Sequence, residues 1–207
     1  MRIIAGDARG IRLTVPMEGG EIRPTEDKVK ESLFSTLGDL NGAVVLDLFS
    51  GTGALGLEAL SRGAAQVVMV ERDVRHAAVI QENLARVRQA IAACGHAPGE
   101  AKVLVADVAD AWGQLPLRPF DVILADPPYH PADGEYGARE LLLDERWTRG
   151  GDRALLALEH ATDVRNLPWA PHSSWRLLRK RSFGIRTVSY AKLALSDELP
   201  ADEEEFV

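Results

Sequence analysis

Residues 124 to 130 read LADPPYH, and they place an acid, two prolines and an aromatic ring directly after an apolar run. Prolines fix φ and donate no backbone hydrogen bond, so they hold the chain rigid and leave carbonyl oxygens free to accept. The stretch therefore offers a fixed carboxylate at Asp126, a free carbonyl at Pro127 and an aromatic face at Tyr129. This set suits a planar base that carries an exocyclic amine.

The amine of such a base is a poor nucleophile, because its lone pair is delocalised into the ring. Hydrogen bonds from its protons to the Asp126 carboxylate and the Pro127 carbonyl would stabilise the positive charge that develops as the nitrogen attacks. Stacking of the base on Tyr129 would add about 1–3 kcal/mol. We therefore predict that Asp126, Pro127, Pro128 and Tyr129 are catalytic, whereas a plain turn is the alternative interpretation.

A second motif, LDLFSGTGALGLEAL, begins at residue 46. Gly51, Gly53 and Gly56 fit the G-x-G-x-x-G pattern of nucleotide sites, and they lie between a predicted strand and a predicted helix, as that pattern requires. Glu71 closes the next predicted strand 20 residues after Gly51, where an acid would hydrogen-bond ribose hydroxyls. The sequence thus predicts a nucleoside site at this turn.

Two further acids indicate which nucleoside binds. Asp47 lies inside the strand before the glycines, where it could meet a cationic amino group or structure the glycine loop. Asp107 follows the third strand, where it could read an adenine amine or simply cap a helix. These acids favour S-adenosylmethionine (SAM) over NAD, whose pyrophosphate they would repel. The predicted cofactor-binding residues are Asp47, Phe49, Gly51, Thr52, Gly53, Glu71, Arg72, Asp107 and Val108.

Strands and helices alternate along the centre of the chain, which predicts an α/β fold with a doubly wound, mostly parallel sheet. Predicted strands cover 44–48, 67–70, 103–105, 121–125 and 154–158, and predicted helices cover 25–38, 54–61 and 74–88. Segments 175–181 and 185–195 predict a C-terminal antiparallel hairpin, residues 2–15 a short N-terminal hairpin, and residues 92–101 a loop. Asp126 would then lie at the carboxyl end of a strand, where such sheets bind ligands.

Composition is that of one soluble domain: 207 residues, 46% apolar and 27% charged. The single cysteine, Cys94, excludes an internal disulfide, and the five histidines show no metal-binding spacing, so no metal site is predicted. We find no signal-peptide core and no apolar run of the roughly 18 residues that span a membrane, so we expect a cytoplasmic protein without membrane contact.

The net charge of −7 argues against a nucleic-acid partner, but the charges are unevenly distributed. Residues 164–196 hold seven basic residues and no acid, whereas the last eleven residues hold six acids. Near the start, Arg2, Arg9 and Arg12 are opposed only by Asp7. The sign of the net charge therefore does not exclude a nucleic-acid partner.

Several segments together resemble one family. The Asp-Pro-Pro-Tyr stretch matches the [DNS]-P-P-[YF] motif of SAM-dependent amino methyltransferases, and the chain is similar to the RsmD family, bacterial enzymes that methylate guanine N2 in 16S ribosomal RNA. The segments that carry the likeness are RIIAGDARGIRL, IRPTEDKVKESLF, LDLFSGTGALGLEALSRGA and VILADPPY and, more loosely, RKRSFGIRTVSYAKLA. The resemblance is in register from Arg2 to about Glu159.

This resemblance implies a seven-stranded methyltransferase domain over 23–196, with an RNA-contacting hairpin extension over 1–22. Residues 197–207 would form an acidic, disordered tail. The candidate RNA contacts are Arg2, Arg9, Arg12 and Arg23. The implied partner is 16S ribosomal RNA within an assembling or assembled 30S particle, bound by a monomeric enzyme, although free RNA stays open as the substrate.

Three other functions fit the sequence less well. An adenine or cytosine amine in DNA would fit the same chemistry, but 207 residues leave no room for a large target-recognition region. Protein glutamine methylation usually goes with N-P-P-Y, which Asp126 does not match. An NAD-linked oxidoreductase would explain the glycines and leave Asp-Pro-Pro-Tyr unexplained.

Overall fold

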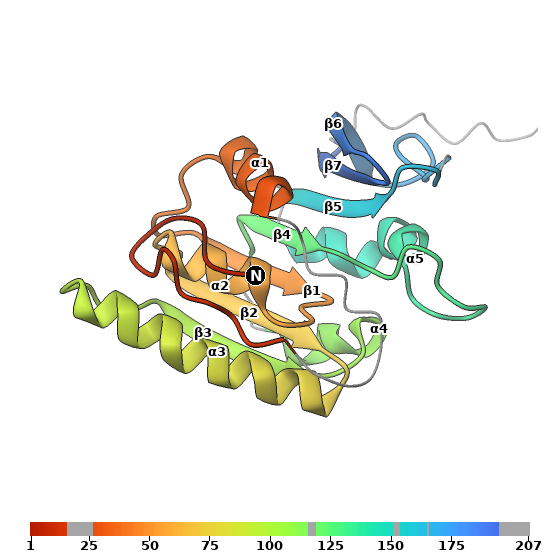
Figure 1. Ribbon diagram of the computed structural model, residues 1–207. Coiled ribbons are helices and arrows are strands. Elements are labelled where there is room, and N and C mark those ends of the chain that lie inside the picture. Colours follow the sequence, from red (N-terminus) through yellow and green to blue (C-terminus); the bar gives the residue numbers. More distant parts are fainter. Residues whose placement is uncertain (16–26, 116–118, 151–153, 165, 195–207) are drawn as a thin grey trace, which may run out of the picture.

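The structure is a computed structural model that describes residues 1–15, 27–115, 119–150, 154–164 and 166–194 (Figure 1). Its centre is a seven-stranded sheet with the order β3-β2-β1-β4-β5-β7-β6. The strands are β1 Val44–Leu48, β2 Gln66–Glu71, β3 Glu100–Val105, β4 Val122–Ala125, β5 Leu155–Ala161, β6 Trp175–Phe183 and β7 Arg186–Leu193. Strands β1 to β5 run parallel, and β7 is antiparallel to both β5 and β6. The predicted doubly wound sheet and C-terminal hairpin are confirmed.

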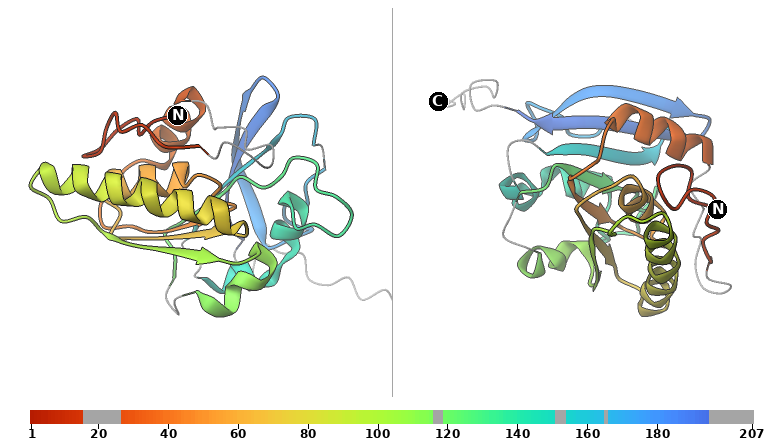
Figure 2. Two further views of the ribbon diagram at one scale, coloured as in Figure 1. Left: turned by 60° about the horizontal axis from the view of Figure 1, so that its bottom comes forward. Right: turned by 90° about the vertical axis from the view of Figure 1, so that its left-hand side faces the viewer.

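Helices cover both faces of this sheet (Figure 2). Helices α1 Asp27–Leu37, α2 Ala54–Ser61 and α3 Val74–Ala93 pack on one face with residues 1–15. Helices α4 Val108–Ala111 and α5 Ala138–Leu143 pack on the other, with the 3₁₀ helices Trp112–Gln114 and Glu145–Gly150. Because successive strand residues point to opposite faces, the apolar runs of β1 and β4 contribute to both cores. No helix within the described ranges is long and apolar enough to cross a membrane.

The segment predicted as a loop at 92–101 is shorter than expected. Helix α3 continues to Ala93, and Gly95 follows in the left-handed conformation with φ 83°. The backbone N–H of Glu100 then donates to the carbonyl of Ala65 at 2.9 Å, which begins the pairing of β3 with β2. The sequence prediction was wrong at both ends of this segment, because residues 92–93 continue helix α3 and residues 100–101 already belong to strand β3. The loop between them has only six residues, 94–99.

Residues 1–15 form a hairpin-like loop held by one antiparallel bridge, Arg2 to Arg12, and by the Ile3 N–H donating to Ile11 at 2.9 Å. Glu58 of α2 anchors it, because its carboxylate accepts the backbone N–H groups of Ile4 and Ala5 at 2.7 and 3.0 Å. Lys30 of α1, fully buried, lies 3.5 Å from the same carboxylate. The hairpin therefore shares a core with α1 and α2. Residues 16–26 and the predicted tail, 197–207, lie outside the described residues.

Candidate active site

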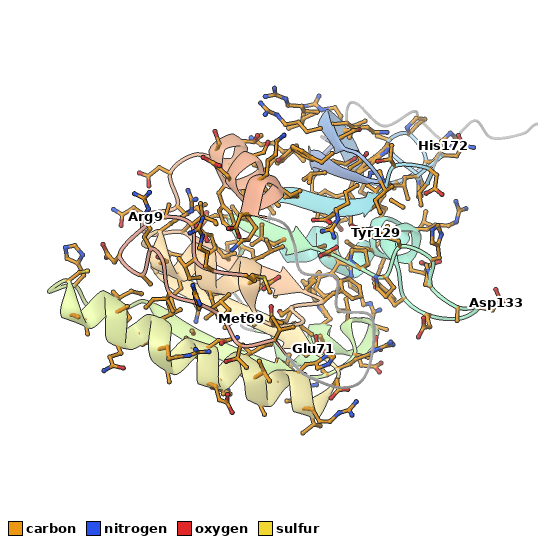
Figure 3. The ribbon with its side chains drawn as sticks, in the orientation of Figure 1. Arg9, Met69, Glu71, Tyr129, Asp133 and His172 are labelled. Carbon is orange, nitrogen blue, oxygen red and sulfur yellow. The ribbon has the colours of Figure 1, made fainter. Side chains whose placement is uncertain are left out.

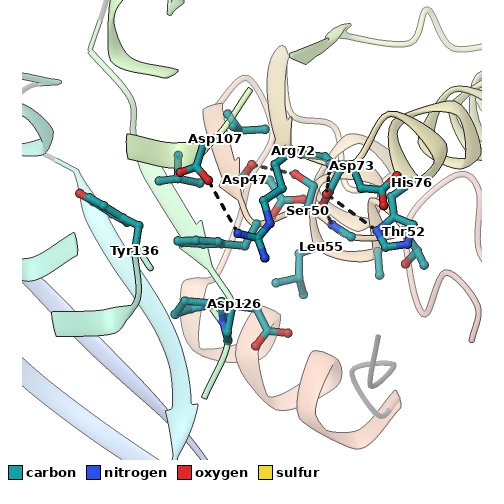
Figure 4. A pocket seen from close by; sticks show the side chains of 18 of the residues that line it. Asp47, Ser50, Thr52, Leu55, Arg72, Asp73, His76, Asp107, Asp126 and Tyr136 are labelled. Atoms are coloured by element: carbon teal, nitrogen blue, oxygen red, sulfur yellow. Dashed lines mark hydrogen bonds and ion pairs between the residues drawn. The ribbon is translucent and has the colours of Figure 1, made fainter. Parts of the chain in front are cut away.

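A cavity of about 520 Å³ opens where the parallel strands end, a volume typical of small-ligand sites (Figure 4). All four predicted catalytic residues line it, together with eight of the nine predicted cofactor residues. The ninth, Gly53, lies at the N-cap of α2. The two predicted motifs, about 75 residues apart in the sequence, therefore form one site.

The glycines of the turn lie where a side chain would be either strained by the backbone conformation or crowded by its neighbours. Gly51 and Gly53 have φ of 55° and 77°, in the left-handed region that glycine adopts readily. A Cβ on Gly53 would lie 3.0 Å from Ile80 Cγ2, and one on Gly56 would lie 2.9 Å from the Oδ2 of Asp47. Phe49 is also left-handed, with φ 60°. The turn thus brings bare backbone to the wall of the cavity.

Asp47 lies on β1 and is 1% exposed. Its Oδ2 accepts the backbone N–H of Gly56 at 2.9 Å, so the carboxylate holds the first turn of α2 against the sheet. Burial raises the pKa of Asp47 to about 7, despite the opposing effect of this hydrogen bond. Of its two sequence-based interpretations, structuring the glycine loop is observed. Because Asp47 also lines the cavity, a cationic ligand there would favour its ionised form.

Glu71, at the end of β2, ties the turn to the next strand. Its Oε2 accepts the Gly51 N–H at 2.8 Å and its Oε1 accepts the Asp73 N–H at 2.8 Å. Asp107 accepts the Ala109 N–H at 2.9 Å, so it caps α4 while it also lines the cavity. Both acids are therefore fixed by backbone N–H groups at neighbouring strand ends.

Arg72 joins two sides of the cavity. Its guanidinium lies 3.2 Å from the Glu135 carboxylate. It also lies 3.8 Å from the carboxylate of Asp107 (Figure 4). Glu135 belongs to the loop that follows the Asp-Pro-Pro-Tyr motif, so this cation links the predicted cofactor residues to that loop. The arrangement places positive charge among the acids that surround the predicted nucleoside site.

The motif follows β4 directly. Asp126 is half-buried at the cavity, Pro127 is buried, and Pro128 is exposed. The Tyr129 hydroxyl donates to Glu159 Oε1 at 2.6 Å. Burial raises the pKa of Tyr129, and its hydrogen bond to Glu159 raises it further. The phenol is therefore a neutral donor, and its ring and the Asp126 carboxylate both line one cavity.

Sequence reasoning missed part of the cavity wall. The Tyr136 ring centroid lies 6.4 Å from that of Phe49, and its hydroxyl donates to Asp144 at 2.7 Å. No motif or periodicity marks this tyrosine; only its position shortly after the predicted catalytic motif could have suggested it. The other lining residues not predicted as ligands include Ser50, Leu55, Asp73, His76, His130 and Glu135.

The structure does not bring the predicted RNA-contacting arginines into the cavity. Arg2 is exposed and its Nε lies 3.0 Å from Asp27, while Arg9 and Arg12 are exposed. Figure 3 shows Arg9 well away from Tyr129. The hairpin turn lies at the C-terminal end of α2, where the Asp7 N–H donates to Ser61, whereas the cavity lies at the N-terminal end. Arg23 lies outside the described residues.

Asp7, the acid expected to oppose these arginines, has another partner. Its carboxylate lies 2.7 Å from His96 Nδ1, in the loop after α3. The acid therefore joins the hairpin to that loop, and its charge faces a histidine.

Five parallel strands form the core of the sheet, the β6–β7 pair lies at one edge, and the site lies at the strand ends. This arrangement defines a Rossmann-like methyltransferase fold. The family described as "Conserved hypothetical protein 95" matches residues 1–192. The chain belongs to this family, the RsmD family, as its motifs suggested.

Similar proteins support this assignment. "Ribosomal RNA small subunit methyltransferase D" of Haemophilus influenzae is 36% identical over 192 residues, 92% of this chain and 91% of the relative. The protein of the same name from Escherichia coli K12 is 36% identical over 89% of this chain and 85% of its own length. The solved structure of yhhF from Escherichia coli aligns with a TM-score of 0.69 and 30% identity, over 94% of this chain and 99% of that one.

Proposed function

We propose that this protein transfers a methyl group from SAM to the exocyclic N2 amine of a specific guanine in the 16S ribosomal RNA of the small subunit. The observation that carries the proposal is the meeting of the Asp126–Tyr129 motif and the acid-rich nucleoside site in one cavity. The names of the relatives, small-subunit ribosomal RNA methyltransferases, support the substrate class.

The residues of the turn fit SAM as the donor. Glu71, at the end of β2, would accept ribose hydroxyls, and Asp107 would accept the adenine amine. Burial raises the pKa of Asp47 to about 7, and its ionised form, which predominates above that pH, would favour the α-ammonium end. When bound, SAM supplies an electrophilic methyl group on a sulfonium sulfur. Gly51 and Gly53 leave the space in which the nucleoside can approach the backbone.

The motif performs the acceptor half of the reaction. The Asp126 carboxylate and the Pro127 carbonyl accept hydrogen bonds from the two amine protons and stabilise the developing positive charge on nitrogen. Tyr129 stacks on the guanine and, with the rigid prolines, fixes the angle at which the amine faces the donor side of the cavity. The proton of the methylated amine then leaves to water.

The RNA is expected to reach beyond the cavity. We propose Arg2, Arg9 and Arg12, which are exposed on the N-terminal hairpin and do not line the cavity, as phosphate contacts. We further propose that the enzyme acts as a monomer. Because its net charge is −7 and its basic residues are confined to small areas, we expect it to dock on RNA already bound by ribosomal proteins in a 30S particle. Such a substrate would place the protein in the bacterial cytoplasm.

The test is transfer of a labelled methyl group from SAM to four acceptors: 30S particles, protein-free 16S RNA, duplex DNA and a protein extract. The modified product is then identified by mass. N2-methylguanosine from 30S particles or 16S RNA is the expected result, with a higher rate on particles. Label only in DNA or protein would refute the RNA assignment and leave the cofactor assignment standing.

A further inference from the structure

Glu159 is a buried acid that the proposed reaction does not use directly. It lies near the end of β5, is 1% exposed, and its Oε1 accepts the Tyr129 hydroxyl at 2.6 Å. The same oxygen lies 3.3 Å from the guanidinium of Arg186 on β7, which is itself 7% exposed. A buried carboxylate is tolerated only when it is paired and hydrogen-bonded, and this one is compensated by the C-terminal strand pair.

We propose that Glu159 is a positioning residue, which anchors the Tyr129 hydroxyl so that the ring that receives the base keeps one orientation beside Asp126. This inference rests on the proposed amino methylation. It assigns a role to the antiparallel β5–β7 pair, which supplies both the carboxylate and the arginine that holds it.

The geometry gives the anchor its effect. A tyrosine side chain turns about two bonds, and Pro127 and Pro128 restrain only its backbone end. The hydrogen bond to Glu159 restrains the opposite end of the ring, so both ends are fixed before a base arrives. Tyr129 is half-buried and lines the cavity, which leaves ring surface for stacking. Pre-ordering of this kind removes an entropic cost from substrate binding and from alignment of the amine.

The anchor is maintained over the working pH range. Burial and the neighbouring Glu159 both raise the pKa of Tyr129, so the phenol keeps the proton that it donates. Arg186, on the other side of Glu159, supplies a compensating positive charge. A phenylalanine at position 129 would retain the stacking ring but would leave Glu159 without this donor.

The experiment compares Tyr129→Phe, Glu159→Gln, Glu159→Ala and the double variant Tyr129→Phe/Glu159→Ala. Steady-state kinetics on the acceptor RNA are measured with SAM binding and melting temperature. Because Tyr129→Phe keeps the Glu159–Arg186 pair, this variant is expected to fold even if the variants at Glu159 do not. We expect it to lower kcat/KM for RNA about tenfold, with SAM affinity unchanged within twofold. Glu159→Gln, which keeps an acceptor oxygen, should stay within threefold of the wild type.

The double variant separates positioning from a general structural role. If Glu159 acts through the Tyr129 hydroxyl, Glu159→Ala should lower kcat/KM for RNA about tenfold in the wild-type background. In the Tyr129→Phe background it should lower kcat/KM less than twofold. Equal losses in both backgrounds would overturn the inference, as would a Tyr129→Phe enzyme with unchanged kcat/KM.

A second readout does not depend on the substrate. In protein labelled with 3-fluorotyrosine, the ¹⁹F resonance of Tyr129, assigned with Tyr129→Phe, should be a single narrow line, and it should stay narrow in Glu159→Gln, which keeps an acceptor for the hydroxyl. It should shift or broaden in Glu159→Ala. An unchanged resonance in Glu159→Ala would overturn the inference even if the wild type methylated some other acceptor, whereas failure of the wild type to methylate RNA would overturn only the proposed function.

Discussion

The buried Asp47 should make the stability of the ligand-free protein depend on pH in an unusual direction. A carboxyl group with a pKa of about 7 in the folded chain and its usual value of 3.8 in the unfolded chain costs stability as the pH rises. The reason is that the unfolded chain releases the proton first. The difference between the two pKa values corresponds to about 4 kcal/mol of stability, at 1.36 kcal/mol per pKa unit. About 3 kcal/mol of this stability is lost between pH 5 and pH 8.5.

The perturbation is Asp47→Asn, which retains an oxygen that can accept the Gly56 N–H and removes the titration. Urea unfolding of both proteins at pH 5, 7 and 8.5 isolates the contribution of Asp47, because other groups titrate equally in both. The free energy of unfolding of the wild type should fall relative to that of the variant by about 3 kcal/mol from pH 5 to 8.5. Asp39→Asn, at an exposed acid, should show no such difference.

The same carboxylate links pH to ligand binding. SAM affinity of the wild type should increase as the pH rises through 7, because the ligand's positive charge favours ionised Asp47. Calorimetric titration of Asp47→Asn should give a weaker affinity with little pH dependence. Parallel pH profiles of stability for wild type and variant would refute the reasoning about burial, and parallel profiles of affinity would refute the contact with the cation.

Two further changes test the glycine turn and the RNA surface. Gly56→Ala places a Cβ 2.7 Å from Met69 Cγ and should lower the free energy of unfolding by about 1–3 kcal/mol, measured by urea unfolding. Gly113→Ala, where the Cβ meets nothing within 4 Å, should change it by under about 0.5 kcal/mol, and equal effects would contradict the packing argument. Arg9→Ala combined with Arg12→Ala should weaken RNA binding and lower the slope of log Kd against log salt by about 1–2, with SAM affinity unchanged. An unchanged slope would remove these arginines from the RNA interface.

The fold was predictable because its signals are local. Short apolar runs such as 44–48 and 122–125 are typical of the strands of a parallel sheet, which is covered on both faces. The glycine turn marks where the first strand ends and a helix begins. The position of Asp126 at a strand end then followed from topology alone. The end of α3 and the start of β3 were misplaced because backbone pairing with Ala65, distant in sequence, decides where β3 begins.

The site was predictable only in part, because some of its contacts join residues that are distant in the sequence. Asp47, Glu71 and Asp126 belong to motifs, so their presence in one cavity could be expected. Glu159 lies 30 residues after Tyr129, and their hydrogen bond exists only because β4 and β5 are neighbours. Tyr136 likewise reaches Phe49 through the path of a loop. Such contacts depend on three-dimensional packing that no spacing rule encodes.

The most direct test of the account is single-turnover methyl transfer by Asp126→Ala, measured on the acceptor that the wild type modifies and alongside the affinity for SAM. The carboxylate is assigned to the charge that develops on the amine, so the rate should fall by about two to three orders of magnitude. SAM affinity should stay within twofold of the wild type. A large loss of SAM affinity with an unchanged transfer rate would contradict the central claim, because it would place Asp126 in cofactor binding and leave the amine without its carboxylate.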